Sequence, residues 1–171
     1  MDYHHLLNEL RADVKRIPPS GEVAGYIPEL KKVNADKFGA YLTAVEIAEG
    51  YGVGDCDERF SLQSISKVCS LTFAFSIEGD QLWKRVGIEP SGSAFNSLVQ
   101  LEYETGIPRN PFINAGAIVI ADILISNLKE KTKETFLNFV RKISNNASID
   151  YNQKMIASEK TAGYRNAALV N

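Results

Sequence analysis

The chain has 171 residues, about the length of one domain, since domains usually contain roughly 100–200 residues. Hydrophobic residues make up 44% and charged residues 23%, which is enough for a core and excludes bulk disorder. With 19 basic and 21 acidic residues the net charge is −2, which excludes a general basic surface for nucleic acid. The two histidines, His4 and His5, are adjacent, so neither a Ser-His-Asp triad nor a histidine zinc site fits, and we predict no metal site. The composition therefore leaves carboxylates, lysine, tyrosine and serine as the candidate catalytic groups.

The sequence also predicts no membrane partner and a cytoplasmic location. No stretch reaches the roughly 18 apolar residues that a membrane span needs. Residues 1–14 have charges scattered among their apolar residues and lack the apolar core of a signal peptide. Cys56 and Cys69 have neither redox-motif nor metal-ligand spacing, and Cys69 is expected as a buried free thiol. Free thiols fit a reducing cytoplasm.

The first part of the chain predicts one helix followed by a short strand region. Apolar residues at helical spacing predict an amphipathic helix over residues 3–16. Residues 39–48 are rich in strand-forming side chains and predict a strand. The glycine-rich segment 50–55 predicts a turn that returns the chain. Phe60 and Leu62 are expected on a second short strand or in an extended segment.

The rest of the chain predicts helices around one long loop region. Residues 64–78 are apolar on most helical faces, which indicates a buried helix that ends at Gly79. Residues 87–113 are rich in proline and glycine, and a loop region of this length in a compact domain is usually functional. A second apolar helix is expected over residues 115–125. Further helices are expected around residues 136–143, over residues 152–161 and from about residue 166.

Few strands can be predicted for a chain of this length. One or two strands are fewer than the roughly five to six of a normal sheet. A strand pair with one exposed apolar face needs more partners or a covering layer. The last helical pattern runs to Asn171 without a cap or turn signal. We therefore expect the chain to be the front part of a larger domain, with an incomplete sheet.

Ser64 and Lys67 form a Ser-x-x-Lys motif at the start of the predicted buried helix. Residues three apart share a helical face, so the lysine amine can approach the serine hydroxyl. The helix N-terminus favours a developing oxyanion, and burial favours a neutral lysine that can act as a base. In the alternative, Ser64 is a helix cap and Lys67 a surface charge. The motif by itself favours that alternative, because Ser126 to Lys129 matches it too.

Other polar residues have two interpretations each. Asn114 is a helix cap or an amide that small neighbours leave open to a ligand, and the residues do not decide between them. Glu159 and Asn166 fit a solvated helix end followed by a turn, since most charged residues lie at the surface. Packing is the default role for Tyr26. Arg109 could pair with a carboxylate, but a solvated loop charge is the default.

Five blocks in the right order resemble the serine-dependent glutaminases, and the resemblance runs through nearly the whole chain. The order and number of the blocks make it far more specific than a Ser-x-x-Lys match. The blocks are Val23–Pro28, Gln63–Lys67, Glu89–Gly92 followed by Phe95-Asn96, Asn110–Ile118 and Ser158–Asn166.

The resemblance implies a reaction and a set of roles. L-glutamine is hydrolysed to L-glutamate and ammonia without a cofactor. Ser64 matches the nucleophile that forms an acyl-enzyme, Lys67 matches its activating partner, and Glu159 matches the residue that recognises the substrate ammonium. The residues that match the group binding the α-carboxylate side and orienting the substrate are Asn166, Asn114 and Tyr26. Family members commonly self-associate, so the resemblance also implies a homo-oligomer, a dimer or tetramer.

The resemblance implies an α/β (α+β) fold like that of the serine β-lactamases and penicillin-binding proteins. In that fold helices cover a sheet, and a helical lobe is added. The chain is then a single glutaminase domain over residues 1–171, incomplete at its C-terminus and helix-rich. Family members continue past the point that matches Asn171, into two tyrosines and a strand with the second oxyanion donor. Losing one such donor costs about 10²–10³ in turnover, so we expect this chain to be weak or inactive alone.

Two alternatives remain at this point. The first is a penicillin-reactive serine hydrolase, although the Ser-Asp-Asn and Lys-Thr-Gly elements of β-lactamases are absent from the chain. The second is an inactive, truncated module that persists as an oligomerising protein, because a missing half of the sheet leaves apolar patches.

Overall fold

The computed structural model describes residues 2–18, 20–46 and 49–170. The chain divides into two compact units, Met1–Ser61 and Leu62–Asn171. The single domain over residues 1–171 stays a prediction. In the described part of the chain, no helix has both the length and the apolar character needed to cross a bilayer.

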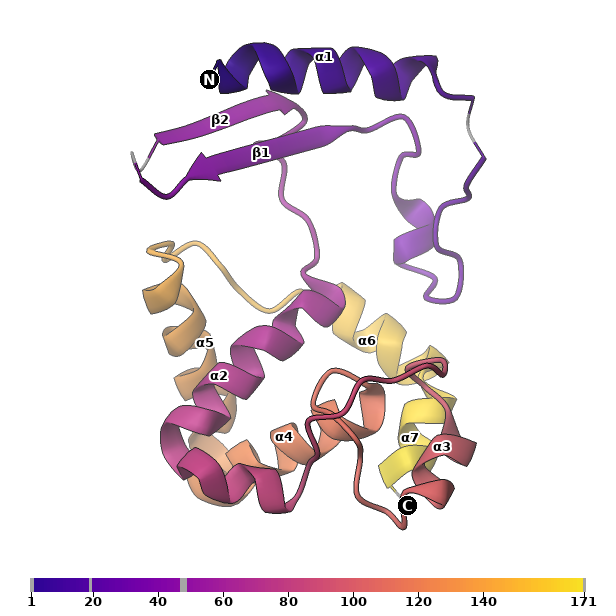
Figure 1. Cartoon of the computed structure of the whole chain (residues 1–171), viewed down its shortest axis with the longest axis vertical. Coiled ribbons are helices and arrows are strands. Elements are labelled where there is room, and N and C mark those ends of the chain that lie inside the picture. Colours follow the sequence, from indigo (N-terminus) through magenta and orange to yellow (C-terminus); the bar gives the residue numbers. More distant parts are fainter. Residues whose placement is uncertain (1, 19, 47–48, 171) are drawn as a thin grey trace. The chain divides into compact units, whose positions relative to one another are not determined.

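The first unit is a helix on a two-stranded sheet. Helix α1 (Tyr3–Arg16) has the predicted bounds and packs against strand β2 (Glu49–Gly54) (Figure 1). The Asp2 side chain caps α1 by accepting a hydrogen bond from the His5 N–H at 2.9 Å. A 3₁₀ turn (Leu30–Lys32) lies between α1 and strand β1 (Gly39–Ala44). The two strands are antiparallel.

The glycine-rich segment was predicted as a turn, and this prediction is wrong: residues 49–54 form β2, and β1 ends at Ala44. Tyr41 lies opposite Gly52 in the sheet. A Cβ atom at Gly50 would lie 1.9 Å from the Tyr41 hydroxyl oxygen. The glycines are therefore strand residues that give the Tyr41 ring space across the sheet. The end of the predicted strand, residues 47–48, lies outside the described residues, and Phe60 and Leu62 lie in no strand.

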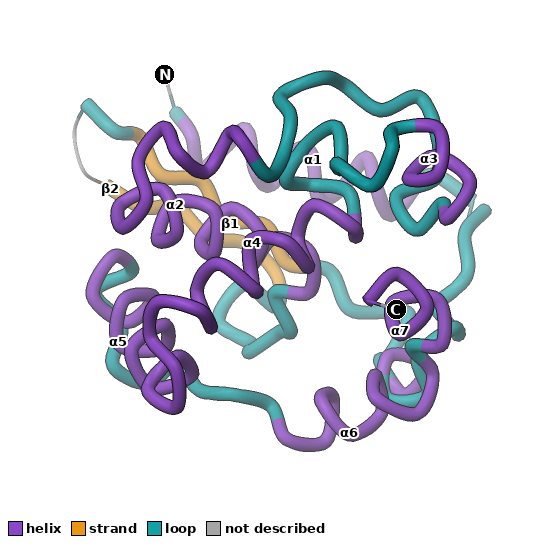
Figure 2. The backbone as a smooth tube through the Cα atoms, turned by 90° about the horizontal axis from the view of Figure 1, so that it is seen from below, coloured by secondary structure: helices purple, strands orange, loops and turns teal. Residues whose placement is uncertain are grey.

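The second unit is helical (Figure 2). The helices predicted over 64–78, 115–125, 136–143, 152–161 and from 166 are all present, with shifted ends. The loop region 87–113 contains one helix that was not predicted, α3 (Leu98–Tyr103). The Ser97 hydroxyl caps this helix by accepting a hydrogen bond from the Gln100 N–H at 3.2 Å. The helices are α2 (Ser66–Glu78), α3 (Leu98–Tyr103), α4 (Asn114–Leu128), α5 (Thr132–Ile143), α6 (Gln153–Ala162) and α7 (Tyr164–Val170), with 3₁₀ turns at Gln63–Ile65, Gly79–Lys84 and Lys129–Lys131.

The core of this unit lies where α2 and α4 meet. Both helices contact α5, and the Phe73 and Phe139 rings stack with their centroids 4.6 Å apart. This packing fixes α2 against α4 and so sets the distance between their N-terminal ends. The fully buried cluster is Ala74, Leu82, Val86, Ile120, Ile123 and Leu124.

The prediction that α2 is buried on most faces is wrong for the described residues. One face of the helix enters the core, while Val68 is 53% exposed and Phe75 is 42% exposed. Cys69, expected as a buried thiol, is half-buried. A helix that is apolar all round needs cover on every side, and the described residues leave the face with Val68 and Phe75 exposed.

Candidate active site

Ser64 lies in the 3₁₀ turn Gln63–Ile65, immediately before α2. The preceding residue, Gln63, has a φ of 47°, in the left-handed region that residues other than glycine seldom adopt. The N-cap of α2 is Ile65, so the interpretation of Ser64 as the cap of this helix is wrong. Ser64 is exposed, and the structure records no hydrogen bond of its side chain within the described part of the chain.

The Lys67 amine is held by two oxygen atoms from a distant segment. Its Nζ donates to the Phe112 carbonyl oxygen at 2.8 Å and to Asn114 Oδ1 at 2.7 Å. The Phe95 ring centroid lies 5.6 Å from Nζ. The side chain is half-buried, and burial lowers the pKa of Lys67 below the ordinary lysine value. The alternative of a solvated surface charge is therefore wrong.

Asn114 joins three helices through its side chain. Its Oδ1 accepts from Lys67 of α2, and its Nδ2 donates to Asn166 Oδ1 of α7 at 2.9 Å. The Asn114 backbone N–H donates to the Phe95 carbonyl at 2.8 Å. The N-cap of α4 is Ile113, so Asn114 is the first residue of the helix and not its cap. The cap interpretation is therefore wrong, and the role of Asn114 as an amide that binds a ligand stays a prediction.

Of the other predicted site residues, neither Ser64 nor Glu159 makes a hydrogen bond or ion pair with this group in the described part of the chain. No hydrogen bond is recorded between Ser64 and Lys67, which lie three residues apart across the start of α2. Glu159 is exposed on α6, and no recorded side-chain contact links it to Lys67, Asn114 or Asn166. Tyr26 belongs to the first unit and is 72% exposed.

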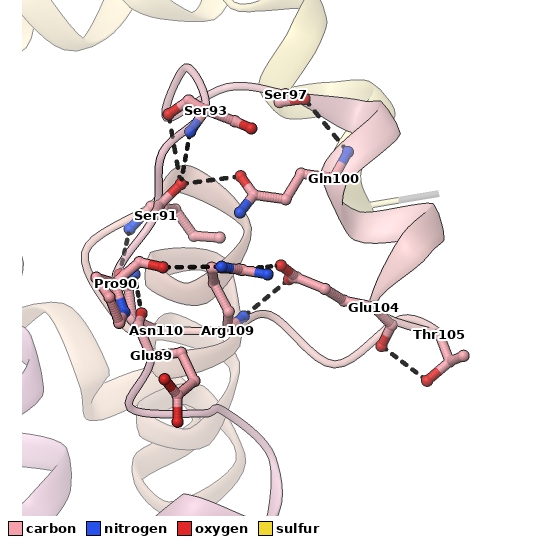
Figure 3. Close-up of polar contacts among 11 residues, drawn as sticks. Glu89, Pro90, Ser91, Ser93, Ser97, Gln100, Glu104, Thr105, Arg109 and Asn110 are labelled. Carbon is pink, nitrogen blue, oxygen red and sulfur yellow. Dashed lines mark hydrogen bonds and ion pairs between the residues drawn. The ribbon is translucent and has the colours of Figure 1, made fainter.

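The loop before α4 is more ordered than a proline-rich and glycine-rich segment suggests (Figure 3). Arg109 forms an ion pair with Glu104, and its Nη1 donates to the Pro90 carbonyl at 2.8 Å. The expectation of a solvated charge at Arg109 is therefore wrong. Burial alone would raise the pKa of Glu104, but the hydrogen bonds and charge of Arg109 hold that pKa below its ordinary value.

Asn110 is a further polar residue, to which no site role was assigned from the sequence. Its Oδ1 accepts from the N–H groups of Phe112 and Ile113, at 2.9 and 3.1 Å. Its Nδ2 donates to the Glu89 carbonyl at 2.8 Å. An asparagine before a proline is a known turn signal, so the turn could have been predicted. The proximity of this turn to Lys67 could not have been predicted, because Lys67 and Phe112 lie 45 residues apart in the sequence.

A family model described as Glutaminase matches residues 21–171, which is most of the chain. The chain belongs to the glutaminase family. A curated glutaminase from Christiangramia forsetii is 52% identical over 171 residues, covering 100% of this chain and 56% of that protein. The chain thus spans little more than half the length of the curated relatives it matches.

Solved glutaminase structures share the fold. The probable glutaminase ybaS superposes with a TM-score of 0.81 at 32% identity, over 88% of this chain and 48% of that one. A probable glutaminase from Bacillus subtilis, complexed with 6-diazo-5-oxo-L-norleucine, superposes with a TM-score of 0.73 at 29% identity. That match covers 97% of this chain and 48% of the other. The predicted fold class, an α/β (α+β) β-lactamase-like serine-hydrolase fold with a helix-rich N-terminal part and an incomplete sheet, is confirmed; the sheet has two antiparallel strands in the described part of the chain.

Proposed function

We propose that the chain carries the Ser64–Lys67 part of a glutaminase active site, which hydrolyses L-glutamine to L-glutamate and ammonia. One observation supports this most directly. The half-buried Lys67 amine is held between the Phe112 carbonyl and the Asn114 amide, and Ser64 lies three residues before it at the start of α2.

The two acceptors suit a neutral lysine that acts as a base. A neutral amine has two N–H groups and one lone pair. If the N–H groups point to the Phe112 carbonyl and Asn114 Oδ1, the lone pair is left for the Ser64 hydroxyl proton. Burial favours this neutral form, since it disfavours the charged one.

In the proposed reaction, Ser64 Oγ attacks the carbon of the substrate's side-chain amide as its proton passes to Lys67 Nζ. Lys67 then gives that proton to the amide nitrogen, which leaves as ammonia while the C–N bond breaks. A water molecule next attacks the acyl-enzyme carbon and loses a proton to Lys67. That proton returns to Ser64 Oγ as the ester bond breaks and L-glutamate is released.

Recognition of a free amino acid needs groups for one positive and one negative charge. We assign the substrate ammonium to the Glu159 carboxylate and the α-carboxylate side to the amides of Asn114 and Asn166, with Tyr26 orienting the substrate. The hydrogen bond between Asn114 and Asn166 supports this assignment, because it joins Asn166 to the amide that contacts Lys67. The ligand of the Bacillus subtilis relative supports the substrate class: it has a ketone and a diazo carbon where glutamine has its amide carbonyl and nitrogen.

The proposal extends to the whole protein. We propose a cytoplasmic homo-oligomer, a dimer or tetramer, that acts on L-glutamine as a small-molecule substrate without cofactor, metal, nucleic acid or membrane partner. A net charge of −2 argues against a nucleic-acid partner, and the absence of a long apolar stretch argues against a membrane partner.

The direct test is ammonia release from L-glutamine. It compares the 171-residue chain with a version extended to the length of the curated relatives, each with Ser64→Ala or Ser126→Ala. Ser126 is a matched control, because it begins the second Ser-x-x-Lys match. We expect the extended version to release ammonia, Ser64→Ala to abolish release and Ser126→Ala to leave it unchanged. Activity that survives Ser64→Ala would overturn the proposal, as would acylation of Ser64 by a labelled β-lactam with no ammonia release.

A further inference from the structure

The Lys67 amine is held by a turn, residues 110–114, whose shape depends on one side chain. Asn110 Oδ1 accepts from the N–H groups of Phe112 and Ile113, which makes an Asx turn. Asn110 Nδ2 donates to the Glu89 carbonyl and so joins the turn to the preceding loop. All three bonds shape the backbone that carries both Lys67 acceptors.

Close packing against α4 fixes this turn further. A Cβ atom on Gly116 would lie 1.9 Å from the Asn110 carbonyl oxygen, so the turn lies directly on the first turn of the helix. Pro111 and Ile113 are buried. The turn is therefore anchored by its backbone and apolar side chains, and Asn110 completes it by satisfying two N–H groups that the fold leaves without a backbone partner.

We propose that Asn110 is a positioning residue for Lys67: by shaping residues 110–114 it presents the Phe112 carbonyl and Asn114 Oδ1 to the lysine amine. Asn110 makes no contact with the amine and acts through these two acceptors. The catalytic meaning of this role rests on the proposed function, while the positioning itself does not.

The consequence concerns the state of the Lys67 amine. Burial lowers the pKa of Lys67, and among the described residues no charged side chain from α4, α5 or the adjoining turns contributes to this shift. Removing the Asn110 side chain frees two backbone N–H groups and releases the loop at Glu89. The Phe112 carbonyl then moves and water reaches the amine, which raises the pKa of Lys67 toward its ordinary value.

The experiment measures the pKa of Lys67 in the folded 171-residue chain. Trace acetylation is carried out over a pH series, and the extent of Lys67 labelling is read by mass spectrometry. The variants are Asn110→Ala and Asn110→Ser, since a serine hydroxyl makes the same turn more weakly. Asn127→Ala is the matched control, because the Asn127 side chain is also hydrogen-bonded, donating to Glu78 and to the Ile123 carbonyl, but lies at the other end of α4.

We expect the Lys67 labelling curve to move to higher pH in Asn110→Ala, to a smaller extent in Asn110→Ser, and not at all in Asn127→Ala. Unchanged curves in folded Asn110 variants would overturn the proposal. If Asn110→Ala does not fold, the serine variant decides by the same criterion. Labelling needs no turnover, so the positioning role and the proposed reaction are tested separately. If the Lys67 labelling curve shifts but the extended version hydrolyses no glutamine, the positioning role is upheld and only the glutaminase reaction is removed.

Discussion

Lys67 is the residue on which the proposed chemistry depends, and arginine tests its role. Arginine keeps the positive charge and the donors toward Phe112 and Asn114, but it does not lose its proton in proteins. We expect Lys67→Arg to lower kcat for ammonia release by about 10²–10⁴, the usual contribution of a general base. Lys129→Arg is the control, because Lys129 ends the second Ser-x-x-Lys match. Equal kcat values in the two variants would show that Lys67 acts only as a charge.

The pH profile follows from the direction of the Lys67 pKa. The base acts when neutral, so kcat/KM should fall as the pH is lowered through this pKa. Because burial puts the pKa below the ordinary lysine value, the fall should also lie below that value. The measurement is kcat/KM against pH for the extended version. A fall centred at the ordinary lysine pKa would contradict a buried base.

Only part of this site could be predicted from residue types and their spacing. Helical spacing was enough to predict that Ser64 and Lys67 share the start of one helix. It could not decide between a cap and a ligand amide for Asn114, because both put an asparagine at a helix start. The structure excludes the cap, because Ile113 is the N-cap of α4, and the side-chain partners of Asn114, Lys67 and Asn166, are 47 and 52 residues away in the sequence.

At the scale of elements, the loop region 87–113 is held by the Glu104–Arg109 pair, which should make its stability depend on pH. A carboxylate whose pKa is lower in the folded state stabilises the fold above its unfolded pKa, and this contribution is lost as the pH falls through the folded pKa. We expect Glu104→Gln to lower the free energy of unfolding by about 1 kcal/mol at neutral pH. Urea unfolding should show this difference shrinking at acidic pH; a difference that does not change with pH would contradict it.

The contact between the 110–114 turn and α4 gives a second prediction at this scale. Gly116→Ala puts a methyl group into the Asn110 carbonyl, so it should lower the free energy of unfolding by about 1–3 kcal/mol despite the higher helix propensity of alanine. Gly92→Ala is the control, because no atom lies within 4 Å of its added Cβ. The measurement is the urea midpoint of each variant. Equal midpoints would show that the turn does not lie against the helix in solution.

Some element boundaries could not be predicted from local sequence signals, because a residue distant in the sequence determines the local structure. In the sequence, Gly50 and Gly52 are typical turn residues. In the structure, the Tyr41 ring occupies the space that their side chains would fill. Helix α3 is six residues long and carries too little periodicity to stand out from a loop. The long helices α1, α2 and α4 were predictable, since their apolar patterns extend over several turns.

At the scale of the whole molecule, exposed apolar side chains favour self-association. Val68 and Phe75 of α2, and Leu10 and Val14 of α1, are exposed hydrophobic residues. We expect the purified chain to elute as a dimer or tetramer by size-exclusion chromatography with light scattering, and to dissociate on dilution. A monomer at every concentration tested would contradict the proposed homo-oligomer.

The most direct measurement of the proposed site is covalent labelling by 6-diazo-5-oxo-L-norleucine, located by peptide mass spectrometry. A nucleophile that attacks this glutamine analogue is alkylated as dinitrogen leaves, so labelling does not require complete turnover. We predict that the label lies on Ser64, that excess L-glutamine prevents it, and that Ser126→Ala leaves it unchanged. A label on Cys56 or Cys69 that glutamine does not prevent, or no label in either the 171-residue chain or its extended version, would contradict Ser64 as the nucleophile of a glutaminase.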